Sequence, residues 1–65
     1  MFQIGDMVQD NSEYANEGIG IVVKLWQTNS DDIVDIMWIE YDQSPQSLYL
    51  HWAKSNLTIL ARNNP

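Results

Sequence analysis

The sequence contains no cysteine and a single histidine, His51, among its 65 residues. The absence of cysteine excludes disulfides and thiolate ligands, and one histidine leaves too few nitrogen ligands for an ordinary zinc site. No serine or cysteine nucleophile pattern accompanies His51, and a domain of this size has no room for a deep substrate pocket. We therefore expect a non-enzymatic protein with no metal, no cofactor and no small-molecule substrate.

Basic residues are also scarce, since only Lys24, Lys54 and Arg62 oppose nine acidic residues and the net charge is −6. Such a chain repels phosphate backbones unless its few cations cluster, so we expect no direct contact with nucleic acid. Three aspartates, Asp31, Asp32 and Asp35, are too few oxygen ligands to predict a calcium loop, and we interpret them as belonging to a solvated turn and its flank.

Long apolar runs are missing as well. No run approaches the ~18 residues that a membrane helix needs. The first four residues are followed at once by Gly5 and Asp6, which is unlike a signal peptide. We expect a protein that neither enters a membrane nor is secreted.

What is present is a series of short apolar segments separated by polar turns. Strands are expected at 6–9, 18–27, 33–41, 47–52 and 57–61, with a polar loop at 10–17, turns at 28–32 and 42–46, and one helical or 3₁₀ turn at 53–56. Residues 1–61 are expected to form one domain, followed by a polar tail at 62–65.

Alternation within the longer segments predicts which side chains share a face. In segment 33–41, the core face is Val34, Ile36 and Trp38, and the opposite face is Ile33, Asp35, Met37, Ile39 and Tyr41. In segment 47–52, Leu48, Leu50 and Trp52 face inward, whereas Tyr49 and His51 face outward. Segment 18–27 carries Ile19, Ile21, Val23 and Leu25 on one face and Val22, Lys24 and Trp26 on the other. A bulge at its glycines would shift the phase, so the inner face of this segment stays open.

Aromatic residues exceed what one small core holds, with three tryptophans and three tyrosines. Exposed aromatic residues and methionine are enriched at protein interfaces. For Trp26, packing at the rim of the core and contact with a partner are equally compatible with the pattern. The residues expected to bind a partner are Tyr14, Trp26, Met37, Ile39, Tyr41, Tyr49 and His51.

Four short motifs together resemble a known family. They are Gly5-Asp6-Met7-Val8, Gly18-Ile19-Gly20-Ile21-Val22, Ile36-Met37-Trp38 and Leu57-Thr58-Ile59-Leu60. Their types and spacing resemble KOW-like and Tudor-like barrels and are more similar to short SH3-like proteins of tailed bacteriophages. The resemblance implies an all-β, five-stranded SH3-like small barrel with a short 3₁₀ turn before the last strand. The chain departs from the family after Trp38, where the usual glycine is missing and the turn is longer.

Three functions follow as alternatives. The resemblance implies a virion accessory protein, in a capsid decoration, neck or tail, that resides in the virion or the host cytoplasm. Such a protein would dock on a larger structural protein through Met37, Ile39 and Tyr41 or through its strand edges. A homo-oligomer is compatible with this role. The second alternative is a peptide-binding or regulatory module, in which Tyr14, Trp26 and Trp52 with Glu13 and Glu17 bind a basic or proline-rich segment. The third, implied by the KOW likeness, is an accessory protein of the transcription machinery.

Overall fold

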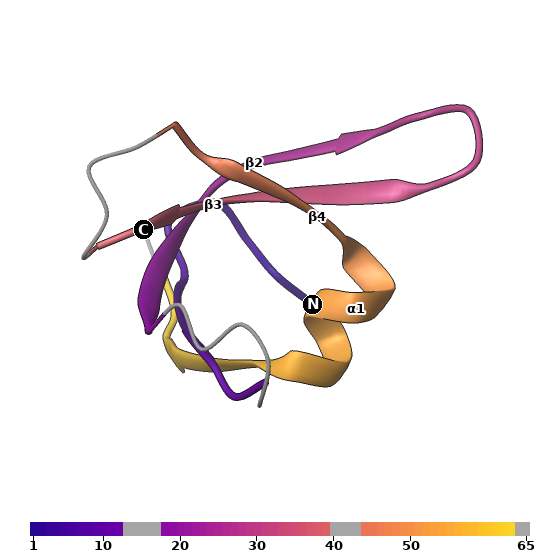
Figure 1. Ribbon diagram of the computed structural model, residues 1–65. Helices are drawn as coiled ribbons and strands as arrows, with labels where there is room; N and C mark the ends of the chain where they lie inside the picture. Colours follow the sequence, from indigo (N-terminus) through magenta and orange to yellow (C-terminus); the bar gives the residue numbers. More distant parts are fainter. Residues whose placement is uncertain (13–17, 40–43, 64–65) are drawn as a thin grey trace.

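A computed structural model describes residues 1–12, 18–39 and 44–63, which form one antiparallel sheet and one short helix (Figure 1). The elements are β1 (Met7–Asp10), β2 (Ile19–Gln27), β3 (Asp32–Trp38), β4 (Gln46–Tyr49), α1 (Leu50–Asn56) and β5 (Leu57–Ala61). The strand order is β4-β3-β2-β1-β5, so β4 and β5 form the two edges and the sheet is not closed within the described residues. The domain is therefore mainly β, as predicted, and α1 connects the two edge strands. No helix in the described part of the chain is long and apolar enough to cross a membrane.

The core lies on the inner face of the central strands. Val8, Val22, Val34 and Ile36 have no exposed surface, and Trp38 is buried beside them. The predicted core face of segment 33–41 is thus confirmed. The core is completed from outside the central strands by the buried residues Phe2, Ala53 and Leu57.

Two glycines shape the start of β2 for different reasons. Gly18 has a φ of 89°, in the left-handed region that glycine adopts without steric cost. Gly20 is buried, and a Cβ at this position would collide with Cγ2 of Ile36 and lie 2.7 Å from Cε3 of Trp38. The absent side chain at residue 20 therefore lets β2 approach the core closely.

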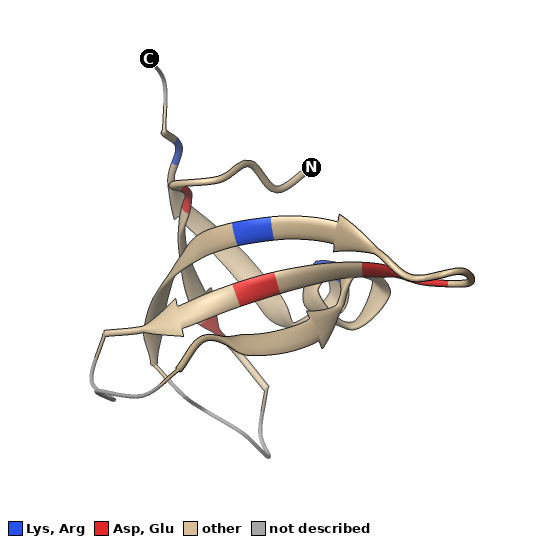
Figure 2. Ribbon diagram, turned by 90° about the horizontal axis from the view of Figure 1, so that it is seen from above, with Lys and Arg blue, Asp and Glu red and all other residues tan. Residues whose placement is uncertain are grey.

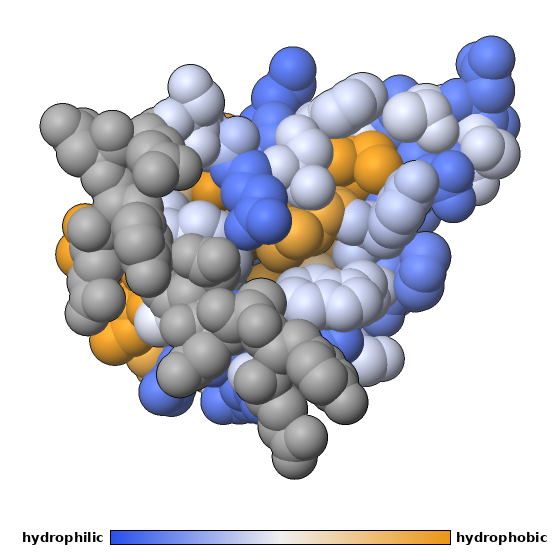
Figure 3. Space-filling model, viewed as in Figure 1, coloured by the Kyte–Doolittle hydropathy of each residue, from blue (hydrophilic) through white to orange (hydrophobic). Residues whose placement is uncertain are grey.

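The bulge in β2 lies at Val23 and not at the glycines. Val22 is opposite Ile36, whereas Lys24 is opposite Asp35, so Val23 is the extra residue. A bulge increases local twist and bends its strand. Beyond it, β2 and the start of β3 project as a hairpin whose tip is hydrophilic (Figure 3). The predicted turn is confirmed there, with the N–H of Thr28 donating to the carbonyl of Asp31 at 2.8 Å.

Two predicted strand ends are wrong. β3 ends at Trp38, so Ile39 lies beyond the strand and is 59% exposed. β4 ends at Tyr49, and Leu50 begins α1, which is longer than the predicted turn. The sequence does not indicate this helix, because its first residues continue the apolar alternation of β4. In the structure, Ala53 is the residue of α1 that is fully buried.

Ile33 lies on the face opposite the core, as predicted, but it is buried there. Trp26 and Tyr49 are its partners on the two neighbouring strands, and such cross-strand neighbours lie close enough to cover it.

Asp6 joins the two ends of the described chain. Its fully buried carboxylate accepts hydrogen bonds from the N–H of Asn63 at 3.0 Å and of Gln3 at 2.9 Å, and Nη1 of Arg62 lies 3.4 Å away. The N–H of Asn63, followed by that of Gln3 and the charge of Arg62, lowers the pKa of Asp6 below 3.8 although burial opposes this. Arg62 and Asn63, expected in a polar tail, are thus bound to the domain.

Candidate functional site

The bulge at Val23 decides which side chains of β2 face outward. Asp35 alternates with Val34 and Ile36, whose side chains are fully buried, so Asp35 is on the outer face of β3. Lys24 is opposite Asp35 and Trp26 is opposite Ile33, which puts both side chains on that same outer face. Leu25, opposite Val34, faces the other way. The sequence left open which face of segment 18–27 is inward, and the bulge places Trp26 outward.

We define the outer face as the surface formed by two rows of residues across β2, β3 and β4. One row is Trp26, Ile33 and Tyr49, and the other is Lys24, Asp35 and Ser47. Lys24 and Asp35 are partners on neighbouring strands, where Figure 2 shows a blue and a red segment side by side. Ile33 forms the buried floor, so the aromatic rings of Trp26 and Tyr49 stand on either side of an aliphatic centre.

Hydrogen bonds hold the indole of Trp26 in place. Its Nε1 donates to Oδ1 of Asp35 at 3.0 Å, and the hydroxyl of Ser47 donates to the same oxygen at 2.6 Å. Nζ of Lys24 lies 5.4 Å from the centre of the Trp26 ring, within the range of a cation–π interaction. Trp26 nevertheless remains 37% exposed. The ring is therefore oriented before any partner arrives.

Asp35 accepts both of these hydrogen bonds as a carboxylate. Burial raises the pKa of Asp35, but the hydroxyl of Ser47, the indole of Trp26 and the charge of Lys24 together bring it below 3.8. At neutral pH the charge on Asp35 keeps the arrangement of Trp26 and Ser47 fixed.

A second aromatic pair extends the outer face toward α1. The rings of Tyr49 and His51 are stacked, with centroids 5.4 Å apart and an angle of 16° between planes. Tyr49 is 53% exposed, and His51 is exposed in the first turn of α1. The predicted outward position of both residues holds, although His51 reaches it from a helix and not from a strand.

The structure brings together three of the seven residues predicted to bind a partner, because Trp26 and Tyr49 flank Ile33 and His51 stacks on Tyr49. Met37 is on the same side of the sheet but lies elsewhere along β3, half-buried opposite Ile21. Ile39 lies past the end of β3, where its N–H donates to the carbonyl of Ile19 at 2.8 Å. Tyr14 and Tyr41 lie outside the described residues.

Sequence reasoning missed Asp35 and Ser47 as members of the site. The available signal was one acidic residue in the middle of an otherwise apolar segment, which needs a hydrogen-bond partner if it is not fully solvated. The sequence groups Asp35 with Asp31 and Asp32, but in the structure Asp35 belongs to the outer face of β3. The described residues contain no cluster of acidic or histidine side chains suited to a metal ion.

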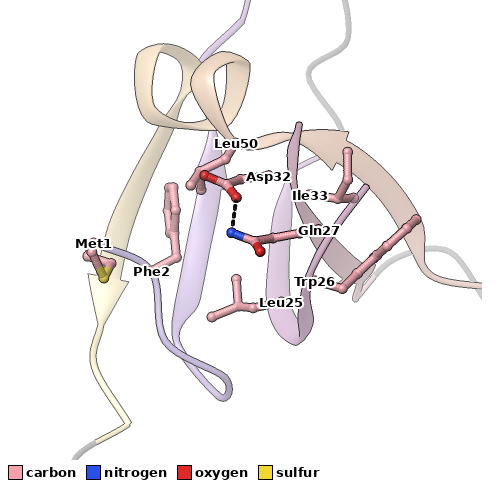
Figure 4. A pocket seen from close by; sticks show the side chains of 8 residues that line it. All are labelled: Met1, Phe2, Leu25, Trp26, Gln27, Asp32, Ile33 and Leu50. Atoms are coloured by element: carbon pink, nitrogen blue, oxygen red, sulfur yellow. Dashed lines mark hydrogen bonds between the residues drawn. The ribbon is translucent and has the colours of Figure 1, made fainter. Parts of the chain in front are cut away.

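A groove of about 470 Å³ lies beside the projecting hairpin, on the side toward which Leu25 points (Figure 4). Met1, Phe2, Leu25 and Leu50 of α1 form its apolar lining, and Trp26 and Ile33, which belong to the outer face, also line it. Nε2 of Gln27 donates to Oδ1 of Asp32 at 2.7 Å at one end of the groove. Trp52 packs against the core, as predicted, but from α1 and not from a strand.

Comparison of the chain with models of protein families, with curated proteins and with solved structures finds no match. The properties of the surface therefore carry the functional argument.

Proposed function

We propose that this chain is a non-enzymatic module with an SH3-like barrel fold that docks on a larger structural protein through its outer face. The observation that carries the proposal is the half-exposed indole of Trp26, held by Asp35 beside the exposed ring of Tyr49. Tryptophan and tyrosine dominate the energetics of protein interfaces, and a ring that is fixed in advance loses little entropy on binding.

The strand order and the short helix before β5 support the SH3-like part of this proposal. The resemblance to short SH3-like proteins of tailed bacteriophages supports a capsid, neck or tail protein as the partner. This resemblance rests on the motifs that begin at Gly5, Gly18, Ile36 and Leu57. Net charge −6 supports a protein partner over nucleic acid.

Site-specific photo-crosslinking tests the proposal. A photoreactive amino acid replaces Tyr49 in one variant and Leu60, which is exposed on β5, in a matched control. In cells that make the native protein, we expect the label at position 49 to crosslink to one larger structural protein and the label at position 60 to give no such product. The crosslinked protein is identified by mass spectrometry.

Purified partner then allows a quantitative measurement. Trp26→Ala removes the anchored ring and is expected to weaken binding about 30-fold, whereas Trp26→Phe keeps a ring but loses the N–H to Asp35 and should weaken it by less. A monomer that yields no crosslink at position 49, or equal binding by Trp26→Ala, would contradict the proposal.

A further inference from the structure

The second half of β2 has an open edge. β1 pairs with β2 only from Ile19 to Ile21, and the last hydrogen bonds on that side join Val22 to Gly5 and Asp6, at 2.7 and 2.9 Å. Beyond Val22, within the described residues, β2 pairs with β3 alone. The edge from residue 23 to residue 27 is therefore unpaired on the side away from β3.

The pairing register shows which backbone groups point toward this open side. The N–H of Thr28 donates to the carbonyl of Asp31, and hydrogen-bonded pairs alternate along antiparallel strands. Trp26 consequently exchanges hydrogen bonds with Ile33, whereas Leu25 and Gln27 direct their N–H and C=O groups away from β3. These groups have the spacing that an added strand requires.

The apolar groove lies beside the same edge. The side chain of Leu25, 40% exposed, points into it and faces Phe2 and Met1, with Leu50 near one end (Figure 4). The stretch that leads to the N-terminus runs from the base of the hairpin toward α1 (Figure 1). A strand added to β2 would present every second side chain to the groove.

The charges around the groove select the kind of segment that fits. Past Asp32 and Leu50 the surface continues into a polar hollow of about 250 Å³ that is also lined by Asp31 and Lys54. Lys24 is on the outer face, away from this side. The two aspartates at the hairpin, in a chain of net charge −6, favour a ligand with basic residues next to its apolar ones.

From these observations we propose that the open edge of β2 accepts an extended basic and apolar segment of a partner protein as an additional strand. Backbone hydrogen bonds to Leu25 and Gln27 provide affinity, and the groove selects apolar side chains, which is the division of labour in β-strand addition. Trp26 and Ile33 line both this groove and the outer face, so the two sites adjoin on the hairpin, but Tyr49 does not line the groove. The strand-addition proposal does not depend on the docking function proposed for the outer face.

A short synthetic peptide tests the proposal. The probe is a fluorescent peptide of about eight residues in which valine and lysine alternate, titrated with the whole chain at ~0.15 M salt and followed by fluorescence anisotropy. We expect a dissociation constant of about 10–100 μM, and binding at least about tenfold weaker for a peptide in which glutamate replaces lysine.

Two variants at one position separate the backbone from the side chain. Leu25→Pro removes the outward N–H while leaving the ladder to β3 intact, because proline is tolerated on an open strand edge. We expect it to weaken binding about tenfold or more, and Leu25→Ala, which keeps the N–H, to weaken it by only about threefold. Thermal unfolding followed by circular dichroism verifies that both variants fold.

A modified probe keeps the test decisive should Leu25→Pro fail to fold. N-methylation of alternate residues blocks the hydrogen bonds of one edge of the peptide only. Two probes are compared, one methylated at the odd-numbered residues and one at the even-numbered residues. One of them is expected to lose binding about tenfold and the other to keep it. Tyr49→Ser, on the outer face, is expected to bind the probe like the unaltered chain.

Three results would overturn the proposal. The first is no binding of the valine–lysine probe. The second is equal binding by the folded Leu25→Pro variant, which would indicate charge attraction alone. The third is loss of binding in Tyr49→Ser, which would place the peptide on the outer face. Because the two surfaces have separate variants, failure at the edge of β2 is distinguishable from failure of docking through the outer face.

Discussion

The two halves of β2 differ sharply although they belong to one strand. Before the bulge, Gly20 and Val22 are buried and the strand is paired on both sides; after it, residues 24–27 are exposed and paired on one side only. The first half lies in the curved body of the domain and the second half in the projecting hairpin (Figure 1). One inserted residue, Val23, therefore separates the part of β2 that stabilises the fold from the part that is available to a partner.

Adjacent valines on either side of this boundary test it most strongly. Val22 has no exposed surface, whereas Val23 is 38% exposed. Val22→Ala leaves a cavity in the core and is expected to lower the free energy of unfolding by about 2.5 kcal/mol, and Val23→Ala by less than about 0.5 kcal/mol. Urea unfolding followed by tryptophan fluorescence measures both. Equal losses in the two variants would show that the boundary does not lie at Val23.

A methyl group added at Gly20 tests the tight packing of the first half. Gly20→Ala forces Cβ into the side chains of Ile36 and Trp38, and we expect the free energy of unfolding to fall by about 2 kcal/mol. An equivalent methyl group in the exposed turn, Ser30→Thr, is the control and should change stability by less than about 0.5 kcal/mol. The same urea titration applies, and unchanged stability in Gly20→Ala would mean that Ile36 and Trp38 can move aside.

The buried carboxylate of Asp6 makes a smaller and pH-dependent contribution to the body of the domain. Because the folded-state pKa of Asp6 lies below 3.8, folding favours the charged form, so this stability is present above about pH 4 and is lost as the pH falls through the folded-state pKa. Asp6→Asn should lower the melting temperature at pH 7, and the difference from the unaltered chain should shrink toward pH 3.

Asp32→Asn is the matched control in the hairpin. Asp32 also accepts a side-chain hydrogen bond, from Gln27, but it is exposed. Melting curves recorded between pH 3 and pH 7 by circular dichroism should show little difference for this variant. If the difference for Asp6→Asn persisted undiminished at pH 3, the charge on Asp6 would not be the cause of the stability.

The sequence predicted the all-β class and its strands better than the ends of its elements. The five strands follow from apolar alternation between polar turns, and the predicted bounds of β5 match the structure. The sequence does not indicate the start of α1, because Leu48 and Leu50 continue the apolar alternation of a strand. The helix buries Ala53 against the rest of the domain, and this tertiary packing is not visible in the local pattern. The end of β3 depends on pairing with β2, which a single segment does not reveal.

The candidate site was predicted in part. Trp26 and Tyr49 were selected as aromatic residues beyond the needs of a small core, but the face of Trp26 depended on the position of the bulge. Val23 has no local signal for a bulge, since valine is a strong strand former and glycines stand close by. The register of β2 against β3, which places Asp35 beside Trp26, is a property of two paired strands and is not encoded in either one alone.

The bonds between Asp6 and the last described residues also bear on how the domain is made. Asp6 and Asn63 are separated by 57 positions, and β1 completes its pairing only with β5. Contacts between the two ends of a chain close a long loop and slow folding. During synthesis β1 completes its pairing only after residues 57–61 have emerged, so we expect this domain to fold in a single cooperative step.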